Sequence, residues 1–418
     1  MRPLAWCCLL LGALAALAPV PSDEGFTLVL GGDTDGYLAP CGCTKPMSGG
    51  IRRRASAVRM LVEGRKAGVL ENGGLIAGTG RQDELKAETM AEVLRQIGAD
   101  VVNVGPAEAR AGRGTLLALG TLTEGRLTSL SLAPSATNSI RPHAVVGPFL
   151  VGGASALPNE LAGVLGETPI PVEQAAANLV RDARLAGLEP VLLLQGSRTD
   201  ALAIAKAQPA IRLIQYRSSG SPPAQAETAG ATLLATPGEF GKHVLRLVWR
   251  DGAFHDYAAV NLGPDTPDDP DASRLYARYL QRVSDEDLLG KTPRSKEDEY
   301  AGTKRCGSCH SDAHRVWKGT AHAGALKTLS VEGHDRDPDC VGCHVVGLDS
   351  TKGFRSLKET PQLANVGCES CHGAGAGHAK APPSAPMRKV GKASCTPCHT
   401  PSHSPRFNFA EYWKRVKH

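Results

Sequence analysis

The sequence predicts two structural parts: an α/β layered sandwich over about the first 260 residues, and a mainly α, loop-rich region from residue 300 onward. In the first part, short apolar runs that suit buried strands alternate with amphipathic helical patterns. The second part is poor in β-branched and aromatic residues but repeats one short cysteine–histidine motif four times. The whole chain has 418 residues, a length that suggests two to three domains.

Residues 1–22 have the pattern of a signal peptide. Arg2 provides a short positive start, residues 4–18 are apolar, and Ala16 and Ala18 suit signal peptidase, with cleavage there or near Ser22. The apolar run is shorter than the ~20 residues of a membrane-spanning helix, and no second such run follows. We expect an exported chain, periplasmic or extracellular, without a stable membrane span; the alternative is an uncleaved anchor.

Residues 23–262 form the predicted α/β domain. Helices are expected at 84–97 and 172–188, where apolar side chains share one face. The Pro- and Asp-rich segment 263–271 is typical of a linker, and the linker region 263–299 contains one more predicted helix at 272–283. The expected strands are 26–30, 69–70, 101–104, 191–194, 211–214 and 244–248.

Four Cys-x-x-Cys-His motifs lie in the region 300–418. Two thiols three residues apart can add to the vinyl groups of one haem, and the imidazole that follows then reaches its iron. One such motif could be half of a zinc site, but four predict four covalently attached haem c groups and electron transfer. The predicted attachment residues are Cys306, Cys309, Cys340, Cys343, Cys368, Cys371, Cys395 and Cys398, and the predicted proximal iron ligands are His310, His344, His372 and His399.

The charge of the chain is unevenly distributed. From Ala301 onward there are 17 Lys and Arg against 9 Asp and Glu, although the whole chain has a net charge of only +5. Haem propionates need cationic partners, so this excess favours haem binding over nucleic acid, which we exclude as a partner. A segment with so few large apolar residues cannot build an ordinary side-chain core, so the porphyrins are expected to serve as the core.

The haem region resembles the tetrahaem cytochrome c-554 family. The resemblance rests on the order of the motifs, on CGSCHSDAHRVWKGTAHAGALKTL from residue 306, and on VGCESCHGAGAGH, which ends at His378. It implies compact haem packing and periplasmic electron transfer, with a five-coordinate haem at His344. The distal ligands that it implies are His378 for the haem of His310, His418 for that of His372, and His322 for that of His399.

Three further histidines, His314, His334 and His403, go beyond the pattern of that family. Any of them could fill the open position of the second haem. His314 shares a helix face with His310, so it suits only a neighbouring haem. His334 and His403 lie in polar loops, where histidines are usually exposed, so we expect both at the surface.

The segment LVLGGDTDGYLAPCGC, from residue 28, resembles the calcineurin-like metallophosphatase and 5′-nucleotidase family. The resemblance implies strand ends that hold two metal ions around a phosphate. Most of the ligands are missing, because Asp35 stands in place of a histidine, Gly74 in place of the bridging aspartate, and Gln195 where a later histidine belongs. We expect this fold without a working dimetal site; Asp33 and Asp35 either hold a hard cation or, as is commoner in turns, cap the chain or face solvent.

Cys41 and Cys43 are the cysteines that neither the leader nor the haem motifs explain. An oxidising compartment favours a disulfide between them. Metal binding and two reduced thiols are the alternatives.

These observations favour a carrier of electrons between redox partner proteins, with the phosphatase-like domain as an inactive docking or structural module. The alternative is a haem enzyme that reduces a small nitrogen or oxygen species at the five-coordinate second haem. A phosphohydrolase fused to a cytochrome is a weaker third interpretation, because the missing metal ligands oppose it.

Overall fold

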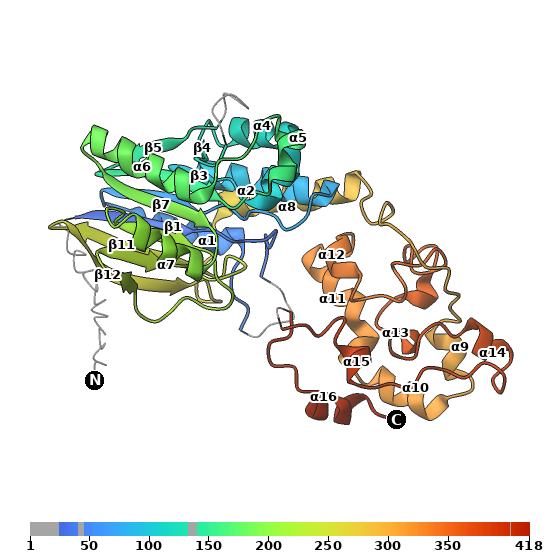
Figure 1. Cartoon of the computed structure of the whole chain (residues 1–418). Helices are drawn as coiled ribbons and strands as arrows, with labels where there is room; N and C mark the ends of the chain where they lie inside the picture. The colour runs from blue at the N-terminus through green and yellow to red at the C-terminus, as the bar shows by residue number, and fades with distance from the viewer. Residues whose placement is uncertain (1–24, 41–45, 133–139, 402) are drawn as a thin grey trace, which may run out of the picture.

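The computed structural model describes residues 25–40, 46–132, 140–401 and 403–418. They form an α/β sandwich and a smaller helical part beside it (Figure 1). The predicted signal peptide, 1–22, and the predicted disulfide partners Cys41 and Cys43 lie outside the described residues.

The first sheet has the strand order β12-β11-β1-β2-β3-β4. Strands β1 to β4 run parallel, whereas β11 pairs antiparallel with both β1 and β12. Burial on both faces explains the nearly continuous apolar sequence of the central strands. The strands are β1 (Phe26–Gly31), β2 (Ala67–Glu71), β3 (Val101–Asn103), β4 (Leu127–Thr128), β11 (His243–Arg250) and β12 (Ala253–Asn261).

The second sheet has the strand order β5-β6-β7-β8-β10-β9. Its four inner strands run parallel, and an antiparallel strand closes each edge. The strands are β5 (His143–Val146), β6 (Phe149–Ser155), β7 (Glu189–Gln195), β8 (Leu213–Tyr216), β9 (Glu227–Ala229) and β10 (Thr232–Ala235).

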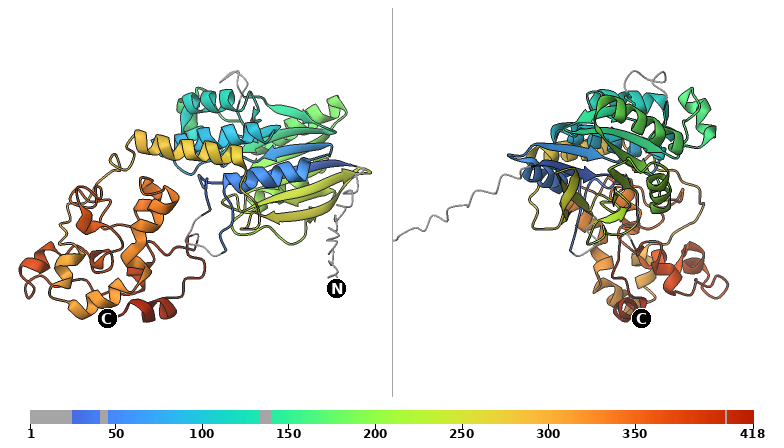
Figure 2. Two further views of the ribbon diagram at one scale, coloured as in Figure 1. Left: turned by 180° about the vertical axis from the view of Figure 1, so that it is seen from behind. Right: turned by 60° about the vertical axis from the view of Figure 1, so that its left-hand side comes forward.

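The two sheets stack, and helices cover the outer face of each, which gives a four-layer arrangement (Figure 2). Apolar residues such as Leu28, Val151 and Leu193 fill the space between the sheets. The helices of the first sheet are α1 (Ile51–Val62), α2 (Arg81–Gln96), α3 (Pro106–Arg110), α4 (Gly112–Leu122), η1 (Asn159–Leu161), α5 (Ala162–Leu165) and α8 (Pro270–Asp285), and those of the second sheet are α6 (Val172–Ala186) and α7 (Arg198–Ala207).

All predicted strands and helices of this part are present, with ends shifted by a few residues, so the predicted fold class is confirmed. Six strands were not predicted: β4, β5, β6, β9, β10 and β12. The central strand β6 was missed because Gly152 and Gly153 interrupt its apolar pattern. A side chain on Gly153 would overlap that of Asn103 on β3, so the glycine allows the two sheets to approach each other.

The helix predicted within the linker region is α8, and it packs against α1 and α2. Asp269 caps it by accepting a hydrogen bond from the amide of Ala272 at 2.9 Å. Leu275 and Tyr279 are buried in the core of the first sheet. The chain that joins the two parts therefore starts only after this helix.

The C-terminal part consists of helices of at most eight residues joined by loops. We predicted no side-chain core here, and that was wrong in part: a small buried cluster includes Val341, Val345 and Phe354. By contrast, α10 and α16 bury none of their residues, as expected of helices that pack on a bound group. The helices are α9 (Thr303–Gly307), α10 (Ser311–Lys318), η2 (Ala321–Gly324), α11 (Ala325–Glu332), α12 (Pro338–Val341), η3 (Pro361–Leu363), α13 (Cys368–His372), α14 (Ala376–Lys380), α15 (Lys392–Cys395) and α16 (Phe409–Val416).

Within the described ranges, no helix combines the length and the apolar character needed to cross a bilayer.

Candidate haem sites and the former metal site

Each Cys-x-x-Cys-His motif lies on or directly after a short helix. The third motif is α13 itself, and Cys340 and Cys395 lie on α12 and α15. The amide of His310 donates to the carbonyl of Cys306 at 3.0 Å, which closes one helical turn. Such a turn places two cysteines three residues apart on one face, as attachment to a single porphyrin requires.

The histidines predicted as proximal and distal ligands face one another in three pairs. An imidazole nitrogen binds a metal at about 2.0–2.1 Å. When two imidazoles bind the same metal from opposite sides, the two metal–nitrogen distances and the two ring radii together place the ring centroids about 6 Å apart. The observed separations therefore fit one iron between the rings of each pair. The pairs are His310 with His378 (6.2 Å), His322 with His399 (6.3 Å) and His372 with His418 (5.8 Å).

Oxygen acceptors orient several of these imidazoles. When Nδ1–H donates to a neighbouring oxygen, the Nε2 lone pair is left for a metal. Burial also lowers the pKa of His322, His372 and His399, which favours the neutral form that binds iron. The Nδ1 contacts are His344 to the Ala325 carbonyl (2.6 Å), His378 to the Ala385 carbonyl (2.9 Å), His418 to the Val416 carbonyl (3.0 Å) and His399 to the Ser404 hydroxyl (3.1 Å).

The four motifs lie close to one another in two pairs. The side chain of Cys306 lies close to that of Cys368, and the side chain of Cys343 lies close to that of Cys398. The first motif is thus next to the third, and the second is next to the fourth. This proximity fits the compact haem packing that the family resemblance implies.

The second motif differs from the others, because His344 faces no second imidazole among the described residues. The ring of His314 lies tilted against that of Trp317 on the same helix, with the ring centroids 5.4 Å apart. His334 and His403 contact tyrosines of the α/β part instead. Among the described residues, no histidine is thus paired with His344 as those of the other three motifs are paired.

The surface positions predicted for His334 and His403 are wrong. Both are half-buried where the two parts of the chain meet. His403 Nε2 lies 3.1 Å from the Tyr37 hydroxyl, and His334 Nε2 lies 3.2 Å from that of Tyr276. No local pattern in the sequence indicates these contacts, because each tyrosine lies far from its histidine along the chain.

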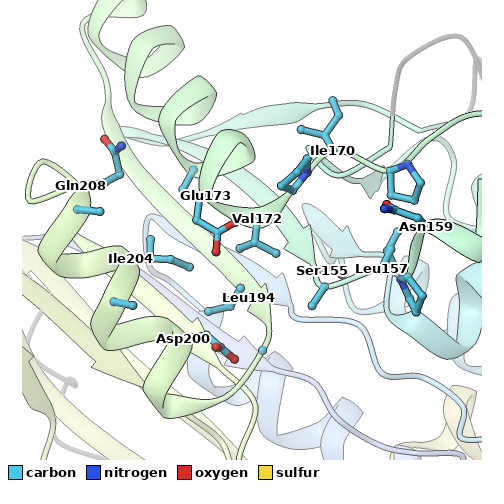
Figure 3. A pocket seen from close by; sticks show the side chains of 18 residues that line it. Ser155, Leu157, Asn159, Ile170, Val172, Glu173, Leu194, Asp200, Ile204 and Gln208 are labelled. Atoms are coloured by element: carbon cyan, nitrogen blue, oxygen red, sulfur yellow. The ribbon is translucent and has the colours of Figure 1, made fainter.

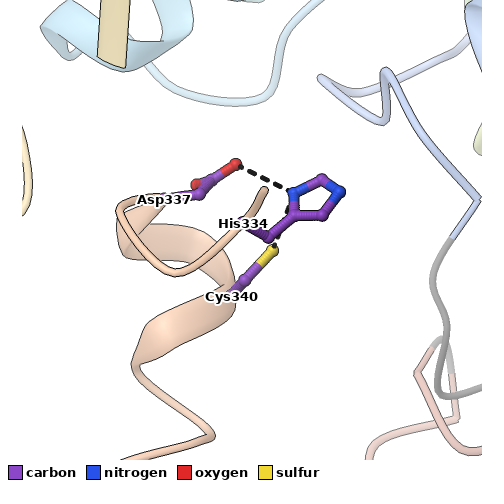
Figure 4. Close-up of side chains that lie close together, drawn as sticks. All are labelled: His334, Asp337 and Cys340. Carbon is purple, nitrogen blue, oxygen red and sulfur yellow. Dashed lines mark hydrogen bonds and ion pairs between the residues drawn. The ribbon is translucent and has the colours of Figure 1, made fainter. Parts of the chain in front are cut away.

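His334 also belongs to a cluster with Asp337 and Cys340, whose potential ligand atoms lie within 4.8 Å of one another (Figure 4). Three such groups could hold a metal ion. Cys340, however, is a predicted haem attachment residue, and a thioether sulfur is no longer a thiolate ligand. If a haem is attached at this motif, the cluster lies beside its attachment point and is not a separate metal site.

The strand ends where the family resemblance implies metal ligands, here called the former metal site, are filled by side chains of the protein itself. Gln195 donates to Asp33 Oδ1 at 2.6 Å, and Arg217 Nη2 donates to both carboxylate oxygens of Asp35, at 2.8 and 2.6 Å. Arg217 Nη1 also lies 3.7 Å from Asp33 Oδ1. A side chain at Gly74, the bridging position, would press on both Asp33 and Arg217. One guanidinium thus supplies the positive charge that metal ions provide in an intact site.

The other acidic residues at these strand ends are used internally as well. Glu71 forms a buried ion pair with Arg54. Glu108 accepts hydrogen bonds from the amides of Leu75 and Ile76. Asp33, which we expected as a cap, a cation ligand or a solvated residue, is fully buried, and its Oδ2 has no hydrogen-bond partner among the described residues.

The protonation of Asp33 predicts a pH-dependent stability. Burial raises its pKa from 3.8 to about 7, so the folded chain keeps a proton that the unfolded chain has released between about pH 4 and pH 7. Stability therefore falls as the pH rises through this window. Asp33→Asn is expected to raise the free energy of unfolding above pH 7 by about 1–4 kcal/mol, with no such gain near pH 4. Urea denaturation across this range measures it, with the exposed Asp349→Asn as control; a pH-independent difference would contradict the assignment.

Two cavities open at the ends of the strands. The smaller, about 360 Å³, is lined by Asp35, Arg217 and Glu239 among others, at the former metal site. The larger, about 740 Å³, lies between α6 and α7 and is mostly apolar (Figure 3). No residue of the haem motifs lines either cavity, so neither belongs to the haem sites.

Comparison with known proteins relates the C-terminal part to cytochromes. A family model described as cytochrome c554 and c-prime matches residues 305–373. Cytochrome c-554 of Nitrosomonas europaea is 38% identical over 91 residues, which are 18% of this chain and 39% of that protein. The chain thus spans less than half of this curated relative, and the fourth motif lies beyond the family match.

Solved structures relate the α/β part to nucleotidases. Sulfate thiohydrolase SoxB of Thermus thermophilus aligns with a TM-score of 0.52 and 18% identity, over 64% of this chain and 62% of that one. A 5′-nucleotidase precursor, also from Thermus thermophilus, has the same score and identity, over 81% and 73%. The NAD nucleotidase of Haemophilus influenzae aligns at 0.52 and 14% identity, over 67% and 64%. The chain therefore joins a region related to cytochrome c-554 to a domain with the fold of the 5′-nucleotidases.

Proposed function

We propose that this chain is an exported tetrahaem c-type cytochrome that carries electrons between redox partner proteins in the periplasm or outside the cell. The observation that carries the proposal is the set of three histidine pairs, each joining one motif to a second imidazole at a spacing that fits iron. When bound, haem c supplies a one-electron Fe(III)/Fe(II) couple. The cysteines of the chain would attach each haem, and the paired histidines would occupy both axial positions of three of the four irons. The surrounding side chains would set how far each haem is exposed to water.

A reductive titration of the purified full chain tests this proposal. Four one-electron equivalents per chain are expected, together with a mass that includes four haems. A capacity of three electrons or fewer would contradict the tetrahaem assignment.

The α/β domain is proposed to be inactive as a phosphatase, because Arg217 supplies the positive charge at the former metal site. We expect no hydrolysis of p-nitrophenyl phosphate by the full chain with added Mn²⁺. Manganese-dependent hydrolysis that disappears in Asp33→Asn would show that the site still works.

A second candidate function is reduction of a small nitrogen or oxygen species at the second haem. The observation in its favour is the absence of a histidine facing His344 among the described residues. Carbon monoxide is a suitable probe, because it binds ferrous haem only where a coordination position is open. Binding of one carbon monoxide per chain would support an accessible iron at the second haem. If no carbon monoxide binds, this alternative loses its basis.

A further inference from the structure

We propose that side chains of α2 and α8 clamp the segment that attaches the second haem, and that this clamp raises the reduction potential of that haem by excluding water from its edge. The clamp consists of Gln82, Lys86 and Tyr276 on the α/β side and His334, Asp337 and Asp339 on the haem side. The inference rests on the proposed function, since it requires a haem at the second motif.

The polar half of the clamp acts on α12, the helix that carries Cys340. Asp337 caps this helix by accepting from the amide of Asp339 at 3.1 Å. The same Asp337 oxygen accepts from Gln82 Nε2 at 2.6 Å, and Lys86 forms an ion pair with Asp339. The α/β part thus binds the first turn of α12 through the carboxylates of Asp337 and Asp339.

The aromatic half reaches the attachment sulfur itself. Figure 4 marks the contacts of His334 with Asp337 and with Cys340. His334 Nδ1 lies 3.9 Å from Cys340 Sγ and 3.9 Å from Asp337 Oδ2. The Tyr276 hydroxyl lies near both ring nitrogens, 3.4 Å from Nδ1 and 3.2 Å from Nε2. Because the thioether bond forms at Cys340 Sγ, His334 and Tyr276 must lie at this edge of the second haem.

Most of the clamp is removed from water. The side chains of Lys86, His334 and Asp337 are 13%, 16% and 7% exposed, whereas that of Asp339 is 56% exposed. The guanidinium carbon of Arg52 lies 5.3 Å from the centre of the Tyr276 ring. Polar contacts of the buried side chains are screened less than those at the surface, so the contact between Gln82 and Asp337 contributes more than the partly exposed pair of Lys86 and Asp339.

A second contact joins the same two regions near the fourth motif. Tyr37 meets His403, whose Nδ1 lies 2.9 Å from the hydroxyl of Thr400, the residue after His399. Tyr37 belongs to the loop after β1 that also carries Asp33 and Asp35. A side chain on Gly36 in that loop would lie 3.2 Å from the Lys86 Cδ atom. The rim of the former metal site is therefore the surface on which the second and fourth haem motifs dock.

The direction of the effect on the potential follows from electrostatics. Ferric haem carries one more positive charge than ferrous haem, and burial disfavours the more highly charged form. Exposure to water is among the properties that set haem potentials. Opening the clamp should therefore lower the potential of the second haem and leave the other three unchanged.

The test compares full-chain variants by spectroelectrochemical titration, following the high-spin haem separately from the low-spin haems. Gln82→Ala with Lys86→Ala should lower the potential of the high-spin haem alone, and small-angle scattering should show the two parts further apart. Tyr276→Phe, which removes a single hydroxyl, should cause a smaller shift in the same direction. Lys86→Arg should retain the wild-type potential, and so should Lys352→Ala, which breaks the exposed pair with Glu299.

An unchanged potential in a double variant whose parts have separated would overturn the clamp, as would an equal shift of all four haems. A wild-type chain that lacks a haem at the second motif would instead contradict the proposed function, and a chain in which all haems are low-spin would contradict the open position of the second haem. The two failures are therefore distinguishable.

Discussion

Replacing His378 with alanine is expected to convert the haem attached at His310 from low-spin to high-spin. The two rings face each other at 6.2 Å, and His378 is held by the Ala385 carbonyl, so the loss of His378 removes the imidazole that the structure pairs with His310. Attachment through Cys306 and Cys309 does not depend on the distal side, so the haem should remain. The electron paramagnetic resonance spectrum should gain one high-spin haem per chain and lose one low-spin haem.

The matched control is His403→Ala, which removes an imidazole of the same region that belongs to none of the three pairs. Its spectrum should keep the wild-type ratio of spin states. If His378→Ala left all low-spin signals in place, the pairing of His310 with His378 would be wrong.

Removing the positive charge of Arg54 is expected to give the largest loss of stability. Arg54 and Glu71 are almost completely buried, at 4% and 1% side-chain exposure, between β1, β2 and α1. Burial already raises the pKa of Glu71 to about 7 despite this partner. Arg54→Met leaves the carboxylate buried without a counter-charge and should cost about 3–5 kcal/mol near neutral pH. Urea denaturation of the full chain, followed by circular dichroism, measures the loss.

Two variants make this prediction specific. The double change Arg54→Met with Glu71→Gln removes the isolated charge and should recover most of the loss. Lys352→Met breaks an exposed ion pair and should cost no more than about 1 kcal/mol. If Arg54→Met were as mild as Lys352→Met, the buried pair would not stabilise the fold as described.

The sequence predicted those features that leave a local signal. The strand β1 follows from a continuous apolar run and the helix α6 from periodic apolar residues. The attachment cysteines stay a prediction, which rests on a spacing that only a few kinds of chemistry use. The partners assigned to His310, His372 and His399 came from the resemblance to a family. The structure places each of these histidines opposite its assigned partner.

Features that depend on distant parts of the chain were missed. Arg217 donates a hydrogen bond to Asp35, which lies 182 positions away in the sequence, and no sequence pattern around either residue predicts this contact. His334 and His403 lie in polar loops, so their local sequence suggested solvent, yet tyrosines from the other part of the chain cover them. Strand β6 was hidden because two glycines stand where a strand normally shows large apolar side chains.

The loss of metal ligands and the docking of the haem part involve the same loop. Asp35 pairs with Arg217, Gly36 lies beneath Lys86, and Tyr37 contacts His403. In the structure this loop is held by an internal cation, Arg217, and it contacts the haem-bearing segment through Tyr37 and His403. The proposed clamp and the internal ion pair therefore use neighbouring residues of one loop.

The central claim is that the chain holds four haems, three closed by histidine pairs and one open at His344. Quantitative electron paramagnetic resonance of the oxidised full chain, normalised to its haem content, tests it most directly. The account predicts four haems per chain in a ratio of three low-spin to one high-spin. Fewer than four haems, or four that are all low-spin, would contradict it.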